Sequence, residues 1–202
     1  MGRQLGILGG TFDPPHYGHL ALAGAARAKL TLDRILFVPA GQPPHKPGRP
    51  ITPAIHRVAM VSLAITDREG LTISHVDLDR PGPHYTVDML AILQRAYPSA
   101  KLFFLMGSDS LAHLLTWRDP CRIVSQATLA VLRRPGWEVE LEKLKQEIPE
   151  IEEQMLWLEG AIVDVSGTEI RRRRRQGLPV DGMVPPAVAN YIRQHRLYQY
   201  RP

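Results

Sequence analysis

The sequence predicts an α/β fold in which a parallel sheet is flanked by helices on both faces. Short apolar runs alternate along the chain with longer segments of helical spacing, a pattern typical of parallel sheets. A Gly-Gly pair follows the first apolar run, where a strand would turn tightly into a helix. The 202 residues, 44% of them hydrophobic, are enough for one substantial core, so we expect a single domain spanning residues 1–202.

Each element follows from its local pattern. Six apolar runs have the length of strands: Gln4–Leu8, Ile35–Val38, Leu71–His75, Leu102–Met106, Thr128–Leu132 and Ala161–Asp164. Seven segments have the spacing or composition of helices: Tyr17–Leu30, Pro53–Thr66, Thr86–Ala96, Ser108–Ser125, Val139–Glu147, Gly167–Gln176 and Pro186–His195. The last two helices would form a C-terminal helical part at about residues 166–202.

Composition excludes several classes of protein. Cys121 is the only cysteine, which rules out an internal disulfide framework and a cysteine-cluster metal site, and we expect it to be a small core residue. The N-terminus has no signal-peptide pattern, and Arg27 and Lys29 interrupt the Ala/Leu-rich stretch Leu20–Leu30. We therefore expect a soluble, cytoplasmic protein without a membrane partner.

Charge is unevenly distributed along the chain. Acidic residues concentrate between Glu138 and Glu153, whereas Arg171–Arg175 form an unbroken basic run. The net charge of +5 favours an anionic partner but does not distinguish a nucleotide from a nucleic acid.

The segment Gly9–His19 reads Gly-Gly-Thr-Phe-Asp-Pro-Pro-His-Tyr-Gly-His and joins the first strand to the first helix. If the helix begins near His16, then His16 and His19 lie on one face of its first turn. The free N–H groups and the dipole of a helix N-terminus favour an anion there. The segment therefore predicts a cradle for nucleotide phosphates. The alternative is a tight turn whose histidines only cap the helix or pack.

A second phosphate element is predicted at Ser166–Arg171. Ser166 and Glu169 have the spacing of a capping box, so a helix should begin here directly after the strand Ala161–Asp164. The Ser166 and Thr168 hydroxyls and Arg171 would then be available to a phosphate, with the other arginines facing solvent. An ordinary helix cap beside a solvated basic face is the alternative.

The Pro- and Gly-rich loop 39–50 follows a predicted strand. In open α/β sheets, ligands bind at the carboxyl edge, so His45 and Lys46 are placed to reach a phosphate. A solvated surface loop explains the same composition.

These motifs carry a resemblance. The segment Gly9–His19 resembles the T/HxGH signature of the nucleotidyltransferase superfamily, and Ser166–Arg171 resembles its Ser-x-Thr-x-Ile-Arg element. Gly167 departs from the Ser or Ala that is common in the family, which removes a side chain and one hydroxyl contact. Five further segments complete a resemblance from about Gly6 to Tyr198 to the bacterial nicotinate mononucleotide adenylyltransferases: Pro43–Lys46, Pro83–Thr86, Met106–Ser110, Thr116–Arg118 and Arg133–Gly136.

The resemblance implies a Rossmann-like nucleotidyltransferase fold and transfer of AMP from ATP to nicotinate mononucleotide, giving nicotinic acid adenine dinucleotide and pyrophosphate in NAD biosynthesis. It implies catalytic roles for His16, His19 and Arg171. The residues implied to bind ATP are Gly9, Gly10, Thr11, Phe12, His16, His19, Gly107, Asp109, Ser166, Thr168 and Arg171. Those implied to bind the mononucleotide are His45, Lys46, Tyr85, Thr86, Trp117, Arg118 and Arg134.

Mg²⁺ is the expected cofactor, bound through the ATP phosphates, because a hard cation bridging phosphate oxygens neutralises their charge. The sequence offers no evident carboxylate cage for this ion, and Asp13 is expected to form a turn rather than to bind metal.

Several alternatives stay open. Trp117 could be a core residue, Asp109 a helix cap, and Arg134 a partner of the acidic stretch. Arg118 could face either the pyridine substituent or solvent. A pantetheine-phosphate adenylyltransferase or a cytidylyltransferase would share the phosphate motifs. A nucleic-acid-binding module is the reading from another class, but the arginine run lacks interleaved aromatic residues, so we expect no nucleic acid partner. The sequence does not set the oligomeric state, and a homo-oligomer is compatible with it.

Overall fold

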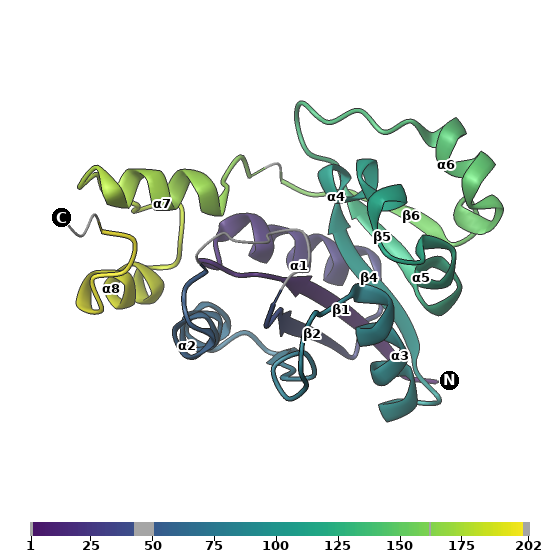
Figure 1. Ribbon diagram of the computed structural model, residues 1–202, viewed down its shortest axis with the longest axis horizontal. Helices are drawn as coiled ribbons and strands as arrows, with labels where there is room; N and C mark the ends of the chain where they lie inside the picture. Colours follow the sequence, from purple (N-terminus) through teal and green to yellow (C-terminus); the bar gives the residue numbers. More distant parts are fainter. Residues whose placement is uncertain (1, 43–50, 162, 200–202) are drawn as a thin grey trace.

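The computed structural model describes residues 2–42, 51–161 and 163–199. Its centre is a six-stranded sheet in the order β3-β2-β1-β4-β5-β6, and every neighbouring pair of strands is parallel. The strands are β1 Gln4–Gly10, β2 Arg34–Pro39, β3 Leu71–Ile73, β4 Lys101–Gly107, β5 Thr128–Leu132 and β6 Met155–Leu158. The predicted parallel α/β fold is confirmed, and Figure 1 shows its arrangement.

Helices follow or precede most of the strands. The α-helices are α1 Tyr17–Lys29, α2 Ala54–Ile65, α3 Thr86–Ala96, α4 Ser108–Ala112, α5 Pro120–Gln126, α6 Leu141–Glu147, α7 Gly167–Arg175 and α8 Pro186–Gln194. Two short 3₁₀ turns complete the described elements, η1 Leu114–Thr116 and η2 Pro149–Ile151. None of the helices in the described ranges is long and apolar enough to cross a membrane.

Successive residues of the central strands pack into two different cores, because side chains alternate across a sheet. In β4, Leu102, Phe104 and Met106 join the core that contains α3, α4 and α5. Phe103 and Leu105 join the core under α1 on the opposite face. Strands buried on both faces read as continuous apolar runs, which is why the sequence pattern identified them.

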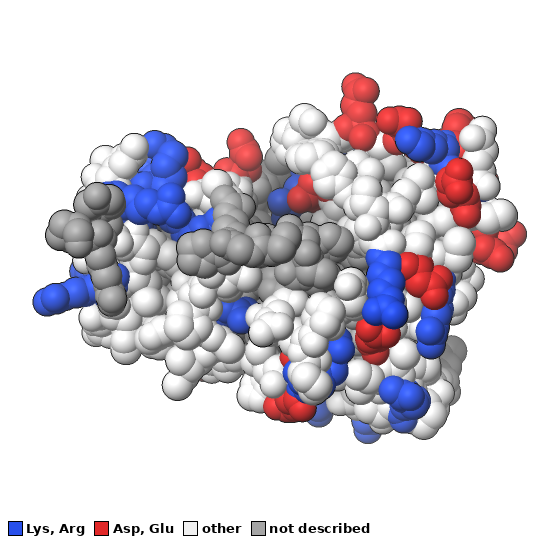
Figure 2. Space-filling view, in the orientation of Figure 1, with Lys and Arg blue, Asp and Glu red and all other residues white. Residues whose placement is uncertain are grey.

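A third apolar cluster lies outside the two sheet cores. It joins Met60 and Ala64 of α2 to Ile170 of α7 and to Val188 and Ile192 of α8. In Figure 1, α7 and α8 accordingly lie together to one side of the sheet, next to α2. Figure 2 shows Lys and Arg gathered over the α7 end of this face and Asp and Glu near α6, so the predicted charge segregation is present in space.

The order of the strands reverses between β1 and β4. Chain connections leave β1 for β2 on one side and leave β4 for β5 on the other, so the carboxyl ends of β1 and β4 border a crevice. Open α/β sheets bind ligands at such a point. The ends of these two strands are Gly10 and Gly107, both in predicted ligand-binding motifs.

The expected strand Ala161–Asp164 is wrong. The sixth strand is Met155–Leu158, which pairs with β5 from Leu129↔Met155 to Leu132↔Leu158. Both segments are short apolar runs. The earlier run takes the position beside β5, and the chain then passes close to α1, where a Cβ on Gly160 would lie 2.8 Å from the Cβ of Ala25.

The expected long helix Ser108–Ser125 is also wrong, since the chain forms α4, η1 and α5 instead. Pro120 has no N–H to donate and begins α5, and the Asp119 carboxylate caps that helix by accepting from the Arg122 N–H at 3.4 Å. Cys121 is exposed rather than a core residue, because this new helix start turns it outward.

Candidate active site

The two predicted phosphate elements meet in one pocket of about 140 Å³. The segment between β1 and α1 contributes Thr11–Pro14, His16 and His19, and the start of α7 contributes Gly167, Thr168 and Arg171. Two helix N-termini therefore border the same space, as the carboxyl-edge argument predicts. Both offer backbone N–H groups and a positive dipole end to an anion.

The two histidines of this pocket stack on one another. His16 is the N-cap of α1, and the centroids of its ring and that of His19 are 3.8 Å apart. The His16 backbone N–H donates to Nδ1 of His19 at 3.2 Å. Because Nδ1 accepts this bond, the ring proton of His19 lies on Nε2, which is the nitrogen able to donate to a phosphate oxygen.

His16 is 5% exposed. Burial, with the positive charge of Arg134 adding to it, lowers the pKa of His16 to about 3, so its ring is neutral at pH 7. Its Nδ1 is buried and has no hydrogen-bond partner within the described ranges. A buried polar atom without a partner at a binding pocket indicates a place that a ligand or water fills.

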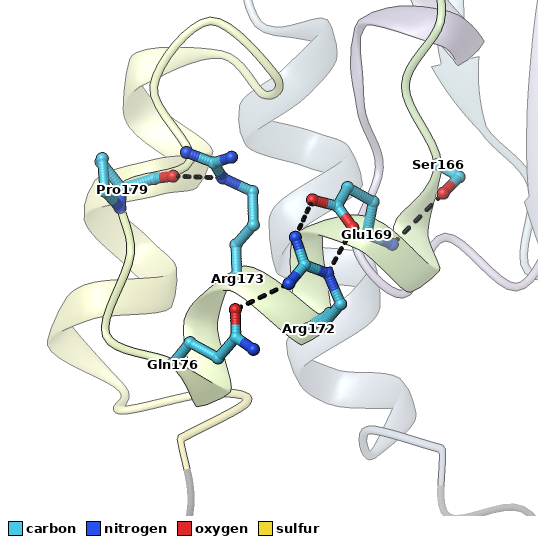
Figure 3. Close-up of polar contacts among 6 residues, drawn as sticks. All are labelled: Ser166, Glu169, Arg172, Arg173, Gln176 and Pro179. Atoms are coloured by element: carbon cyan, nitrogen blue, oxygen red, sulfur yellow. Dashed lines mark hydrogen bonds and ion pairs between the residues drawn. The ribbon is translucent and has the colours of Figure 1, made fainter.

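Helix α7 begins as predicted, with Ser166 as its N-cap. The Ser166 hydroxyl accepts from the Glu169 N–H at 3.2 Å, as Figure 3 shows. The Glu169 carboxylate bonds Arg172 at 2.6 and 2.7 Å. Arg171 instead points to the pocket, where Nη1 donates to the Asp13 carbonyl at 2.6 Å and Nη2 to the Thr168 hydroxyl at 3.2 Å.

The remaining arginines of α7 point elsewhere. Arg172 also bonds Gln176, and Arg173 donates from Nε to the Pro179 carbonyl at 2.8 Å. Arg173 and Arg174 are half-buried, so the expectation that they face solvent is wrong for these two. The arginine run is therefore divided between the pocket, the helix surface and the loop that follows α7.

A second pocket, of about 200 Å³, lies beside the first and shares Thr11 with it. Its walls include four residues predicted to bind the mononucleotide, namely Tyr85, Thr86, Trp117 and Arg118, together with Gly9 and Gly10. Tyr85 is the N-cap of α3, so the free N–H groups of that helix begin here. Trp117 contacts Phe104 edge-on with ring centroids 6.0 Å apart, which leaves it partly in the core and partly in the pocket wall.

Arg118 is exposed, and its guanidinium lies over the Tyr85 ring, 4.7 Å from the centroid. This position combines the two readings left open by the sequence. The side chain reaches solvent, yet its charge lies at the wall of the Trp117 pocket.

A third pocket, of about 230 Å³, is lined by Asp109, Arg134, Gly18 and Ser166 among others. Arg134 Nε lies 3.4 Å from Asp109 Oδ1, and the Arg134 N–H donates to the Ser108 hydroxyl at 2.8 Å. A Cβ on Gly107 would come within 2.2 Å of Asp109 Oδ1, so the pair packs directly on the strand end. Arg134 therefore lies beside the predicted ATP residue Asp109, and its role toward the mononucleotide phosphate stays a prediction.

His45 and Lys46 lie outside the described residues. The sequence reading missed Asp77 and His84, which also line the Trp117 pocket. His84 Nδ1 accepts from the Gln42 N–H at 2.7 Å, and Arg80 pairs with Asp77 at 2.7 Å. Burial raises the pKa of Asp77 despite this pair. The one available signal was that His84 stands directly before Tyr85 in a motif already noted.

The lining of the phosphate pocket suits anions. Within the described ranges, no group of three or more His, Cys, Asp or Glu residues is placed to hold a metal ion. The carboxylate of Asp13 accepts from the Tyr198 hydroxyl at 2.7 Å and from the Thr52 N–H at 3.3 Å, so both of its oxygens have protein donors. Mg²⁺ bound through the ATP phosphates stays a prediction.

Comparison with known proteins decides the family. The family model described as cytidylyltransferase-like matches residues 7–173. A probable nicotinate-nucleotide adenylyltransferase of Thermomicrobium roseum is 47% identical over 196 residues, covering 97% of this chain and 92% of the relative. The chain belongs to the nicotinate-nucleotide adenylyltransferase family. A probable nicotinate-nucleotide adenylyltransferase of Thermus thermophilus is 42% identical over 199 residues, which cover 97% of this chain and 100% of that relative.

Solved structures of nicotinate-nucleotide adenylyltransferases share the fold. The nicotinic acid mononucleotide adenylyltransferase of Plasmodium falciparum complexed with NaAD has a TM-score of 0.77 at 19% identity, with 97% of each chain covered. A putative nicotinate-nucleotide adenylyltransferase of Vibrio parahaemolyticus has a TM-score of 0.72 at 17% identity, covering 98% of this chain and 97% of that one. The predicted Rossmann-like nucleotidyltransferase fold is confirmed.

Proposed function

We propose that this protein transfers AMP from ATP to nicotinate mononucleotide, producing nicotinic acid adenine dinucleotide and pyrophosphate. The observation that carries the proposal is the shared wall at Thr11 between two pockets. One pocket joins the two phosphate elements, and the other is lined by Trp117 and Tyr85. A planar ring and a polyphosphate could thus be held side by side at the end of β1.

In the proposed reaction, a phosphate oxygen of the mononucleotide attacks the α-phosphorus of ATP. The bond from that phosphorus to the oxygen bridging to the β-phosphorus breaks, and pyrophosphate leaves. Neither step requires a protein nucleophile, so the site must align two anions and stabilise the charge on the transferring and leaving groups.

The residues of the phosphate pocket supply these donors. His19 would donate from Nε2, because its Nδ1 is used by the His16 N–H. Arg171 would neutralise charge on the leaving phosphates from the start of α7, with the Thr168 hydroxyl beside it. The neutral His16 ring would contribute a hydrogen bond rather than a charge.

The other two pockets would hold the rest of the substrates. Asp109, which borders the third pocket, would accept a ribose hydroxyl of the adenosine half, and Ser166 lines the same pocket. Trp117 would stack on the pyridine ring, and the N–H groups at the start of α3 near Thr86 would meet its carboxylate. Mg²⁺ bound to the triphosphate would reduce its negative charge.

A pyrophosphate-release assay with three acceptors tests the proposal. Purified protein is given ATP with nicotinate mononucleotide, nicotinamide mononucleotide or 4′-phosphopantetheine, and the products are identified by mass. We expect the highest kcat/KM with nicotinate mononucleotide and a product of the mass of nicotinic acid adenine dinucleotide. Turnover of 4′-phosphopantetheine alone would establish the pantetheine-phosphate reading instead, and a preference for the nicotinamide form would overturn the choice of acceptor.

A further inference from the structure

Asp13 is the point in the lining of the phosphate pocket where three separate parts of the chain meet. Its Oδ1 accepts from the Tyr198 hydroxyl at 2.7 Å, and its Oδ2 from the Thr52 N–H at 3.3 Å. Its backbone carbonyl accepts from Arg171 Nη1 at 2.6 Å. A residue in the middle of the segment between β1 and α1 is thus bound from both its side chain and its main chain.

Arg57 holds the same segment from α2. This side chain is 1% exposed, and its Nη1 donates to the Thr11 carbonyl while its Nε donates to the Thr52 carbonyl, both at 2.8 Å. Burial lowers the pKa of Arg57, and the negative charge of Asp13 acts in the opposite direction. The buried guanidinium and the Asp13 carboxylate therefore offset one another across the segment.

Tyr198 reaches Asp13 from the end of the described chain, 185 residues away. Its backbone has φ +62°, a left-handed conformation that costs a tyrosine about 1 kcal/mol or more. The side chain is half-buried, and burial is the main cause that raises its pKa, so the hydroxyl stays a donor. A strained residue persists where surrounding contacts hold it, and strain of this kind concentrates at functional sites.

We propose that Tyr198 and Asp13 form a latch, by which the C-terminal segment holds the phosphate-binding turn in the geometry that His16, His19 and Arg171 need. The latch consists of the hydrogen bond between the Tyr198 hydroxyl and Asp13 Oδ1. Both are positioning residues, because they act through the histidines and Arg171. This inference rests on the proposed function for its kinetic effect, though not for its structural effect.

The latch acts on orientation for a geometric reason. Asp13 precedes His16 by one short turn, and Phe12 before it also has a left-handed φ of +50°. Loss of the Tyr198 hydroxyl would leave Asp13 Oδ1 buried without this donor. The turn can then relax, and both the His16 N–H to His19 bond and the carbonyl that holds Arg171 shift with it.

The experiment compares Tyr198→Phe with Tyr191→Phe. Tyr191 lies in α8 in the same C-terminal part, and its hydroxyl bonds His56 Nδ1 at 3.0 Å rather than Asp13. Each variant loses one hydroxyl and nothing else, and thermal unfolding verifies that both fold. Three quantities are measured: kcat and KM with ATP and nicotinate mononucleotide, and hydrogen exchange of backbone amides in the peptide covering residues 11–19.

For Tyr198→Phe, we expect kcat about tenfold lower, KM for the mononucleotide within about twofold of wild type, and exchange in residues 11–19 about tenfold faster. Tyr191→Phe should change none of these, even if its melting temperature falls by a similar amount. Such a split separates positioning from a general loss of stability.

The latch is overturned if exchange in residues 11–19 is unchanged by Tyr198→Phe, or if both variants behave alike. It is equally overturned as a positioning device if exchange rises while kcat stays at the wild-type value. A wild-type protein that does not turn over nicotinate mononucleotide refutes the proposed function instead. In that case, hydrogen exchange of residues 11–19 in Tyr198→Phe still decides whether the latch exists.

Discussion

The starts of α1 and α7 face the same pocket but are held in different ways. Phe12, Asp13 and His16 before α1 are buried, and the helix packs on the sheet. Ser166 and Thr168 at α7 are exposed, and that helix belongs to the separate cluster with α2 and α8. A helix N-terminus that borders the phosphate pocket thus occurs once inside the fold and once on its surface.

The difference separates two tasks. A group fixed by burial can be placed before substrate arrives, so its hydrogen bonds can strengthen in the transition state without further reorganisation. A group on an exposed helix start contributes charge and reach, but solvent screens it and part of its binding energy is spent on ordering the side chain. We therefore expect the α1 side to determine kcat and the α7 side to contribute more to ATP binding.

The largest expected effect is that of His19→Ala. Removing a donor that has been placed in advance should lower kcat by about 10²–10³-fold with little change in KM. Steady-state kinetics against both substrates measures this, with circular dichroism to verify folding. An unchanged kcat with a raised KM would mean that His19 binds the ground state only, and the proposed difference between the two helix starts would not hold.

The second expected effect is on the pH dependence of stability, and it concerns only His16 at the buried start of α1. The pKa of His16 is about 3 in the folded protein, against 6.5 for a histidine in the unfolded chain, so below pH 6.5 the unfolded chain takes up the proton first. Stability is lost as pH falls from 6.5 toward 3. Relative to His16→Gln, wild type should lose about 2 kcal/mol more between pH 6.5 and about pH 5.

Urea unfolding of wild type and His16→Gln at several pH values measures this difference. Parallel pH dependences in the two proteins would show that the His16 ring is accessible to protons in the folded state. The α1 start would then be no more enclosed than the α7 start.

Arg171→Lys tests the exposed side and should have an intermediate effect. A compact ammonium cannot donate at once to the Asp13 carbonyl, the Thr168 hydroxyl and a phosphate, so we expect kcat/KM for ATP about tenfold lower, mostly through KM. Arg172→Lys is the matched control, since Arg172 bonds Glu169 and Gln176. Equal losses in both variants would attribute the effect to helix charge rather than to the site.

The smallest effect is expected for Gly167→Ala. A Cβ here would lie 3.2 Å from the Asp13 carbonyl oxygen and 3.2 Å from Arg171 Nη1, which is tight but can be relieved by a small shift. KM for ATP should rise about twofold, with kcat unchanged, because only the position of Arg171 is disturbed. Gly24→Ala in α1, where a Cβ would meet nothing within 4 Å, should leave KM unchanged. A large fall in kcat for Gly167→Ala would show that the α7 start is as critical as the α1 start.

Local chemistry explains what the sequence could predict. Turn glycines, helix caps and apolar periodicity are properties of neighbouring residues, and the rule that ligands bind at the carboxyl edge brought Gly9–His19 and Ser166–Arg171 together. The sixth strand was misplaced because two short apolar runs competed, and only pairing with β5 selects Met155–Leu158. Asp119-Pro120 was a local signal for the break before α5 that the sequence reading passed over.

Tertiary contacts explain what it could not predict. The side on which Arg134 lies depends on how the chain leaves β5, and its pairing with Asp109 has no local pattern. Tyr198 and Arg57 carry no motif, since their partners Asp13 and Thr11 are distant in sequence. Such contacts hold the motif residues in place. A sequence motif contains the residues that line the pocket, but not the distant residues that support them.

The buried guanidinium of Arg57 has an evolutionary consequence. An uncharged residue in place of Asp13 would leave the Arg57 guanidinium buried without the nearby negative charge. Loss of Arg57 would in turn remove its hydrogen bonds to the Thr11 and Thr52 carbonyls. Mutations at these positions therefore penalise one another. Across diverging lineages, the residues at positions 13, 57 and 198 should therefore be kept together or change together, so that substitutions at these three distant positions are correlated.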